Sequence, residues 1–197
     1  MGVNPRPHTV RPLIEAAAIE RRVTEIARDI DRDYAGTDGL VAICVLKGAT
    51  FFFTDLVRKL TVPVFVDFFQ TSSYGTSTRA GEIRIKRDIE LTVRDRDVLL
   101  VEDILDTGWT LKTILDLFKF RGARSVKLCA LLDKHEAREV EVPLHYCGFK
   151  IGRDFVVGYG LDYAERHRNL PYVGVVEFED DAVSATPAPA ESNQEKR

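Results

Sequence analysis

The sequence predicts a single α/β domain built around a mostly parallel β-sheet. Three short apolar runs, at residues 40–46, 98–101 and 125–132, have the composition of strands that are buried on both faces. Segments with apolar residues at helical spacing lie between or beside these runs. Strands that alternate with helices in this way are typical of a central sheet flanked by helices.

Length and composition narrow the class of protein. The chain has 197 residues and a net charge of −3, with Lys and Arg scattered along it, which argues against a nucleic-acid or membrane surface. No apolar run approaches the length needed to span a bilayer. Cys44, Cys129 and Cys147 lie in or beside apolar stretches and form no metal-binding pattern. We therefore expect buried free thiols in a cytoplasmic protein.

The two ends of the chain are expected to lie outside the folded domain. Residues 1–10 are predicted to form a flexible arm, and residues 179–197, which are acidic and then rich in Ala, Pro and Ser, a disordered tail. Between Arg11 and Gly36 apolar residues recur at helical spacing opposite a charged face, which predicts an amphipathic helix. The domain is therefore assigned to residues 11–178.

The most informative stretch is VLLVEDILDTGWTL, residues 98–111. Its apolar start predicts a strand, and the carboxylates Glu102 and Asp103 are expected where that strand ends. A short polar loop at residues 106–110 follows, and then a helix. A loop that enters a helix directs free backbone N–H groups and the positive end of the helix dipole at one point, which suits a phosphate monoester.

The residue types of this loop favour a phosphate other than that of ATP or NAD. Thr107 and Thr110 offer hydroxyl donors, and Gly108 allows a close approach of the backbone. Neither GxxxxGK[ST] nor GxGxxG is present. The alternative is that Asp106 simply caps the helix. The neighbouring carboxylates weigh against this alternative, because they repel each other unless a ligand hydroxyl or a divalent cation satisfies them.

Other predicted strands also end in residues that could bind a ligand. Lys47-Gly48 follows the strand at 40–46, and Lys134 follows the strand at 125–132, both at the edge where open α/β sheets bind ligands. A solvated loop lysine is the alternative at each position. Residues 71–81 are small, polar and without periodicity, which predicts a mobile lid or a simple hairpin tip.

Together these segments resemble a known family. VLLVEDILDTGWTL resembles the phosphoribosyl-diphosphate (PRPP) signature of the type I phosphoribosyltransferases. GFKIGRDFVVGYGLDYAERHRNLPYVGV, at residues 148–175, is similar to the hypoxanthine-guanine phosphoribosyltransferases in particular. The resemblance covers roughly residues 10–178. It implies a mostly parallel sheet flanked by helices, a small hood, and a flexible lid loop at residues 71–81.

The resemblance also implies an activity. It indicates transfer of the 5-phosphoribosyl group from PRPP to N9 of hypoxanthine or guanine in purine salvage, with release of diphosphate, Mg²⁺ as cofactor, and a homodimer or homotetramer. Two alternatives stay open. A phosphoribosyltransferase for xanthine or another base would share the phosphate loop, and a regulator could bind PRPP without catalysis. The weak basic character argues against an RNA partner.

The resemblance assigns roles to individual residues. Asp106 would act as the general base that takes the proton from N7 of the purine. Glu102, Asp103 and Asp162 would hold the ribose hydroxyls or the metal. The substrate-binding residues would be Lys47, Gly48 and Arg168 for the diphosphate, Ser73 and Tyr74 in the lid, Asp106, Thr107, Gly108, Trp109 and Thr110 for the 5′-phosphate, and Lys134, Phe155 and Val156 for the base.

Some of these assignments have plain structural alternatives, and two positions depart from the family pattern. Phe155, flanked by valine, could be a core residue, and Arg168 could be a surface charge. Trp109 is bulkier than the residues usual at its position, and Gly152-Arg153 replaces the more common Pro-Asp or Pro-Asn. The resemblance further implies a non-proline cis peptide between Leu46 and Lys47.

Overall fold

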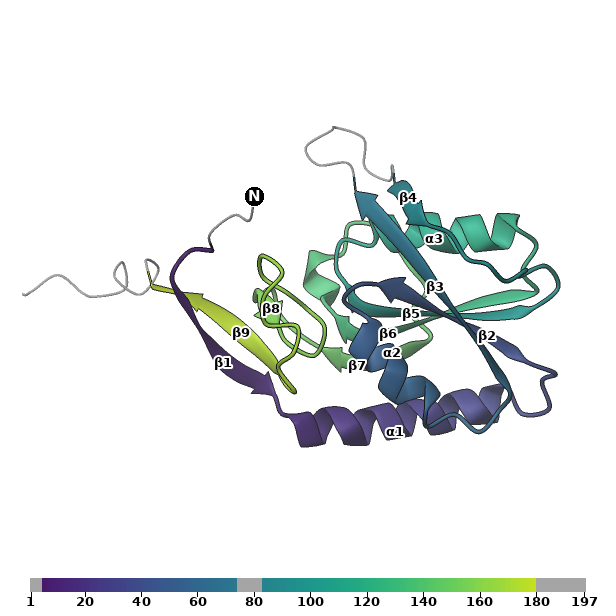
Figure 1. The fold of residues 1–197 in the computed structure, drawn as a ribbon, viewed down its shortest axis with the longest axis horizontal. Coiled ribbons are helices and arrows are strands. Elements are labelled where there is room, and N and C mark those ends of the chain that lie inside the picture. Colours follow the sequence, from purple (N-terminus) through teal and green to yellow (C-terminus); the bar gives the residue numbers. More distant parts are fainter. Residues whose placement is uncertain (1–4, 74–82, 180–197) are drawn as a thin grey trace, which may run out of the picture.

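The computed structural model describes residues 5–73 and 83–179. These residues form a large sheet covered by helices and a smaller sheet at one end of it (Figure 1). The first four residues of the predicted arm, Tyr74 with most of the predicted lid, and the predicted tail beyond residue 179 lie outside the described residues.

The large sheet contains β2 (Leu40–Leu46), β3 (Val64–Ser73), β4 (Ile83–Arg87), β5 (Asp97–Leu105), β6 (Ser125–Asp133) and β7 (Tyr146–Lys150). The small sheet contains β1 (His8–Ile14), β8 (Val156–Val157) and β9 (Val173–Phe178). The helices are α1 (Ala16–Asp33), α2 (Thr50–Val57), α3 (Trp109–Phe120) and the 3₁₀ turn η1 (His135–Ala137).

The order of strands in the large sheet is β4-β3-β2-β5-β6-β7, and every neighbouring pair is parallel except β3 and β4. From β2 the chain adds β3 on one side, and it later returns to add β5 on the other. The strand order therefore reverses between β2 and β5. In open α/β sheets the carboxyl ends of strands at such a switch point are where ligands bind.

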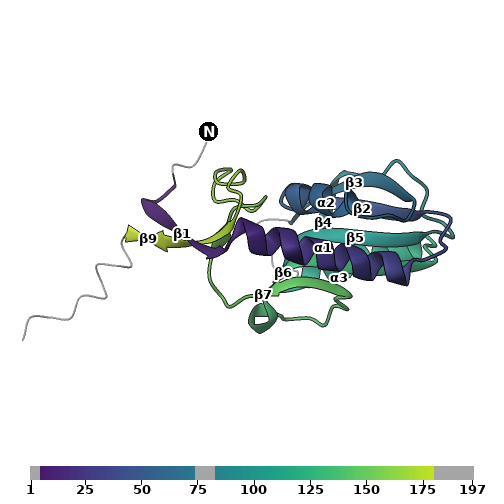
Figure 2. The same ribbon diagram turned by 90° about the horizontal axis from the view of Figure 1, so that it is seen from below.

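The sheet is buried on both faces, as the apolar runs predicted. Residues Leu40, Ala42 and Cys44 of β2 join the core beneath α1 and α2, whereas residues 41, 43 and 45 join the core beneath α3. Figure 2 shows α1 lying along one face of the sheet. This two-sided core confirms the predicted fold class.

Among the described residues, no helix combines the length and the apolar character needed to cross a membrane.

The cysteines are free, as the sequence predicted. Cys44 and Cys129 are buried, and Cys147 is partly buried. Burial raises the pKa of the Cys44 thiol to about 12 and also raises the pKa of Cys129. Buried thiols of this kind are chemically inert and act as small core residues.

The N-terminal segment differs from the prediction. Strand β1 begins at His8, inside the predicted arm, and α1 begins at Ala16 rather than near Arg11. β1 pairs antiparallel with β9, with Val10 opposite Val176. Pro12 fits this strand because β1 lies at the edge of its sheet. The pairing partner is at the other end of the chain, so the local periodicity from Arg11 could not reveal it.

The end of β5 and the start of the predicted lid at residue 71 also differ from the prediction. β5 continues to Leu105, so Glu102 and Asp103 lie within the strand rather than after it. β3 continues to Ser73, which pairs with Ile83 of β4, so residues 74–82 connect two antiparallel neighbours. β2 pairs with β5 only as far as Val101. The two acids therefore lie where β5 has lost its neighbour on the β2 side.

Candidate active site

The 106–110 loop joins β5 to α3 with a glycine as the helix cap. Gly108 has a φ of +95° and is the N-cap of α3, with no side-chain hydrogen bond at that cap. A Cβ at this position would lie 3.0 Å from the carbonyl oxygen of Val140, so the close approach also requires glycine. Asp106 is exposed and does not cap the helix. The capping alternative for Asp106 is therefore wrong.

The carbonyl groups at the start of this loop are held by the segment that carries Lys134. The backbone oxygens of Leu105, Asp106 and Thr107 all accept hydrogen bonds from residues 134–140. The donors are Lys134 N (3.0 Å), Arg138 Nε (3.1 Å), Glu139 N (3.0 Å) and Val140 N (3.2 Å). The loop predicted to bind phosphate and the segment predicted to bind the base are therefore held together directly.

A cavity of about 200 Å³ lies over the loop. Its lining includes both acids of β5 together with Asp106, Thr107 and Thr110, but not Trp109. The fold thus brings together at one cavity the side chains that the sequence assigned to ribose, phosphate and proton transfer.

The two acids of β5 form a close pair. Burial, and then the neighbouring Asp103 carboxylate, raise the pKa of Glu102 well above its ordinary value. Asp103 accepts a hydrogen bond from the N–H of Ile104 at 2.7 Å. Within the described residues no group of three or more His, Cys, Asp and Glu side chains is arranged to hold a metal. A pair of carboxylates without further protein ligands suits Mg²⁺, which usually takes one or two carboxylates and keeps water or phosphate ligands.

The turn after β2 packs directly on this pair. A Cβ on Gly48 would lie 1.5 Å from Oδ2 of Asp103, and a Cβ on Gly160 would lie 1.9 Å from the carbonyl oxygen of Gly48. The peptide bond between Leu46 and Lys47 is cis, which confirms the expectation from the resemblance. Three segments that are far apart in the sequence therefore meet within contact distance at the switch point.

Arg168 lies in the loop that contains Gly160. Its Nη2 is 2.7 Å from Oδ1 of Asp162, and its Nη1 donates to the carbonyl oxygen of Gly160 at 2.8 Å. Its Nε is one of two buried side-chain atoms in the described part of the chain that have no hydrogen-bond partner. With 22% of its side chain exposed, Arg168 is not the plain surface charge of the alternative interpretation.

The residues predicted to bind the base lie at the small sheet of β1, β9 and β8, which we call the hood, and at the end of β6. Phe155 is 45% exposed, so it is not a core residue. Its ring packs edge-on against Tyr163 and stacks with Phe178 at an interplanar angle of 27°. Val156 is buried in β8, and Lys134 is only 9% exposed beside the 106–110 loop. Lys134 is thus not a solvated loop lysine.

The two departures from the family pattern have defined surroundings. Trp109 is the first residue of α3, and its Nε1 donates to Oε2 of Glu139 at 2.8 Å. Arg153 donates to the carbonyl oxygen of Glu136 at 3.0 Å, and Gly152 is exposed. Both departures therefore contact the 134–140 segment.

Sequence reasoning gave no role to two acids of the site, Glu165 and Asp133. Glu165 pairs with Lys47, and Asp133 pairs with Arg138, whose Nε holds the Asp106 carbonyl. Glu165 lies in the charged run at residues 162–168, from which the sequence singled out only Asp162 and Arg168. Its role depends on a contact with a distant lysine, so no local pattern could identify it.

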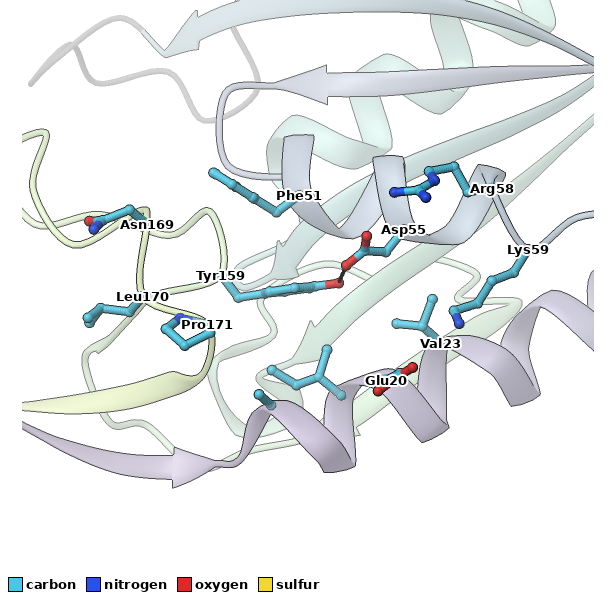
Figure 3. Close-up of a pocket in the computed structure, with 12 residues that line it drawn as sticks. Glu20, Val23, Phe51, Asp55, Arg58, Lys59, Tyr159, Asn169, Leu170 and Pro171 are labelled. Carbon is cyan, nitrogen blue, oxygen red and sulfur yellow. Dashed lines mark hydrogen bonds between the residues drawn. The ribbon is translucent and has the colours of Figure 1, made fainter.

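A larger cavity lies elsewhere. It measures about 630 Å³ and lies between α1, α2 and residues 159–171 (Figure 3). The hydroxyl of Tyr159 donates to Asp55 at 2.6 Å within it. None of the predicted site residues lines this cavity. Cavity size alone would therefore have indicated a different site from the one that the chemical groups define.

Comparison with known proteins agrees with the geometry of the switch point. The family model described as phosphoribosyl transferase domain matches residues 13–164. The chain is 43% identical over 178 residues to hypoxanthine phosphoribosyltransferase of Haemophilus influenzae, covering 89% of this chain and 99% of that protein. A crystal structure of a hypoxanthine-guanine phosphoribosyltransferase from Bacillus anthracis has a TM-score of 0.82 and 39% identity, covering 85% of this chain and 99% of that one.

A third relative is much longer than this chain. Over 168 residues the chain is 47% identical to the bifunctional protein TilS/HprT of Listeria monocytogenes, and the match covers 85% of this chain but 26% of that protein. The chain thus spans about a quarter of the length of this relative. By its matched domain, its identity to full-length relatives and its fold, the chain belongs to the hypoxanthine-guanine phosphoribosyltransferase family of type I phosphoribosyltransferases.

Proposed function

We propose that the protein transfers the 5-phosphoribosyl group of PRPP to N9 of hypoxanthine or guanine, giving IMP or GMP and diphosphate. The observation that carries this proposal is the meeting of three segments at the switch point. Gly48 packs against Asp103, Gly160 packs against Gly48, and the acids of β5 share one cavity with Asp106. Groups suited to ribose, phosphate and diphosphate are therefore adjacent.

In the proposed reaction the bond from C1′ to the diphosphate oxygen breaks and the bond from C1′ to N9 forms. The sugar would pass through an oxocarbenium-like state, so catalysis rests on positioning and electrostatics. Lys47 and Arg168 would hold the departing diphosphate, and Glu102 and Asp103 the ribose hydroxyls. Residues 106–110 would hold the 5′-phosphate through backbone N–H groups and the hydroxyls of their two threonines.

The base would lie between the hood and the end of β6. The exposed face of Phe155 would stack on the purine, the backbone of Val156 would contact its edge, and Lys134 would donate a hydrogen bond to the exocyclic oxygen. As the bond to N9 forms, the proton on N7 would pass to the exposed carboxylate of Asp106, acting as general base.

We propose Mg²⁺ as the cofactor, with Glu102, Asp103 and Asp162 as the residues that would hold it. Burial, and then the repulsion within the acid pair, raise the pKa of Glu102, which fits a site that a divalent cation completes. When bound, the ion would neutralise charge on the leaving diphosphate. We also propose a homodimer or homotetramer.

A single assay tests the activity. The full chain is incubated with PRPP, Mg²⁺ and, separately, hypoxanthine, guanine, xanthine, adenine and uracil, and nucleotide formation is followed by chromatography. We expect IMP and GMP to form. Formation of xanthosine monophosphate alone would assign the protein to xanthine, and PRPP binding without any nucleotide product would make it a regulator. Either result would overturn the proposal.

A further inference from the structure

One carboxylate bridges the two cations that we assign to the diphosphate. The oxygens of Glu165 lie 3.0 and 3.1 Å from Nζ of Lys47, and Oε2 lies 3.3 Å from Nη2 of Arg168. Lys47 follows β2, whereas Glu165 and Arg168 belong to the loop between β8 and β9. The bridge therefore joins the two segments that would grip the leaving group.

The backbone of this loop directs Glu165 towards the cations. Ala164 and Glu165 have positive φ angles of 51° and 62°, which are uncommon for residues with a Cβ. The N–H of Glu165 donates to Oδ2 of Asp162 at 2.8 Å, while Oδ1 of Asp162 pairs with Arg168. Asp162 therefore fixes both the backbone of Glu165 and the guanidinium that Glu165 contacts.

Charge and exposure make the Glu165 carboxylate easy to exchange for another anion. A glutamate is normally ionised at neutral pH, and both of its partners here are cations. Its side chain is 66% exposed, so it can leave the cations and enter water without losing solvation. The side chain of Lys47 is 54% exposed, so its ammonium group is open to a larger anion once Glu165 moves away.

We propose that Glu165 is a placeholder for diphosphate. It occupies Lys47 and Arg168 in the empty site, gives way when the diphosphate group of PRPP binds, and returns as diphosphate leaves. The carboxylate thereby lowers the affinity of the site for diphosphate and favours its release. This inference rests on the proposed function, because that function assigns the two cations to diphosphate.

The test measures diphosphate affinity directly. Sodium diphosphate is titrated calorimetrically into the full chain at a fixed Mg²⁺ concentration, for the wild type, Glu165→Gln and the control Glu25→Gln. Glu25 is an exposed glutamate that pairs with Arg22 at 2.7 Å on α1. We expect Glu165→Gln to bind diphosphate about two- to tenfold more tightly, the scale of two exposed ion pairs, and Glu25→Gln to match the wild type.

A double-mutant cycle tests whether Glu165 lowers the diphosphate affinity through its contact with Lys47. Lys47→Met should weaken diphosphate binding, and Glu165→Gln should gain less affinity in that background than in the wild type, because one of its two partners is absent. In the forward reaction the inhibition constant of diphosphate should fall in Glu165→Gln by the same factor as the dissociation constant.

The outcomes separate this inference from the proposed function. If the wild type binds no diphosphate and forms no nucleotide, both fail. If the wild type binds diphosphate and makes nucleotide, but Glu165→Gln binds diphosphate equally or more weakly, the placeholder inference alone is overturned. A weaker Glu165→Gln variant that Glu165→Asp restores would instead make this residue a direct contributor to ligand binding, which also overturns it.

Discussion

Arg138 links the backbone of Asp106 to a buried carboxylate. Its Nε donates to the Asp106 carbonyl oxygen at 3.1 Å, and its Nη2 pairs with Asp133 at the end of β6. The side chains of Arg138 and Asp133 are only 14% and 7% exposed. Because Lys134 follows Asp133 directly, this pair connects the predicted general base to the segment predicted to bind the purine.

Removal of Arg138 is expected to lower both stability and turnover. Arg138→Met leaves Asp133 as an unpaired buried charge, which should cost about 3–5 kcal/mol in the free energy of unfolding. The double variant Arg138→Met/Asp133→Asn should recover much of that loss in denaturant unfolding. Its kcat should stay low, because the Asp106 carbonyl is still without its donor. A double variant with wild-type kcat would show that Arg138 serves stability alone.

Asp106→Asn should reduce kcat by about 10²–10⁴-fold, because a general base is typically worth that much. The KM for PRPP should change little, since the loop backbone that would bind the phosphate is retained. Steady-state kinetics with hypoxanthine measure both constants. Asp116→Asn, an exposed residue of α3 that pairs with Lys112, is the matched control and should keep full activity. An Asp106→Asn enzyme with most of its activity would remove the assignment.

Lys134→Ala should mainly impair binding of the base. Its side chain is expected to donate to the exocyclic oxygen of a 6-oxopurine, so the KM for hypoxanthine should rise while the KM for PRPP changes little. The loss of a hydrogen bond from a charged group corresponds to about 10–100-fold. A variant in which PRPP binding weakens more than hypoxanthine binding would contradict this role.

Gly48→Ala should abolish most activity in a protein that still folds. The added Cβ would lie 1.5 Å from Oδ2 of Asp103, so either the turn after β2 or the acid must move. Gly152→Ala is the control, because the nearest atom to its added Cβ is 4.0 Å away. Circular dichroism checks folding, and the nucleotide assay measures activity. Normal activity in Gly48→Ala would show that this close contact is dispensable.

Stability should fall as the pH drops below about 6.5. Loss of solvation, then the neighbouring His8 and Arg166, lower the pKa of His167 from its ordinary value of 6.5. The folded state therefore binds fewer protons than the unfolded state, and stability is lost as the pH falls from about 6.5 towards the lowered pKa. The rings of His8 and His167 are in hydrogen-bond contact at 2.9 Å.

This pH dependence can be checked by measuring Tm at pH 7.5 and pH 5.5. The variant His167→Asn is suitable because residue 167 has a φ of 72°, a conformation that Asn tolerates better than most residues. Its Tm should fall less between the two pH values than that of the wild type. An equal fall in both proteins would place the titrating group elsewhere.

Several features of the site could be predicted from local sequence alone. The buried strands at residues 40–46 and 125–132 were recognisable because a strand enclosed on both faces needs a continuous apolar run. Polar residues just after such runs indicated where Lys47 and Lys134 would lie. Phe155 is exposed, although its flanking valines suggested a core residue, and only the resemblance assigned it to the base.

Other features depend on contacts that no local pattern contains. The sequence by itself determined the fold class and the edge of the sheet at which polar residues gather. Periodicity indicates which segments are buried, and the alternation of strands with helices indicates that the strands run in the same direction. The sequence also identified the loop that enters α3. Only the tertiary structure decided that β1 pairs with β9, that Gly108 rather than Asp106 caps the helix, and that Glu165 bridges Lys47 and Arg168. The physical reason is that these contacts join residues from distant segments, and their energies depend on distances that no local stretch of sequence reveals.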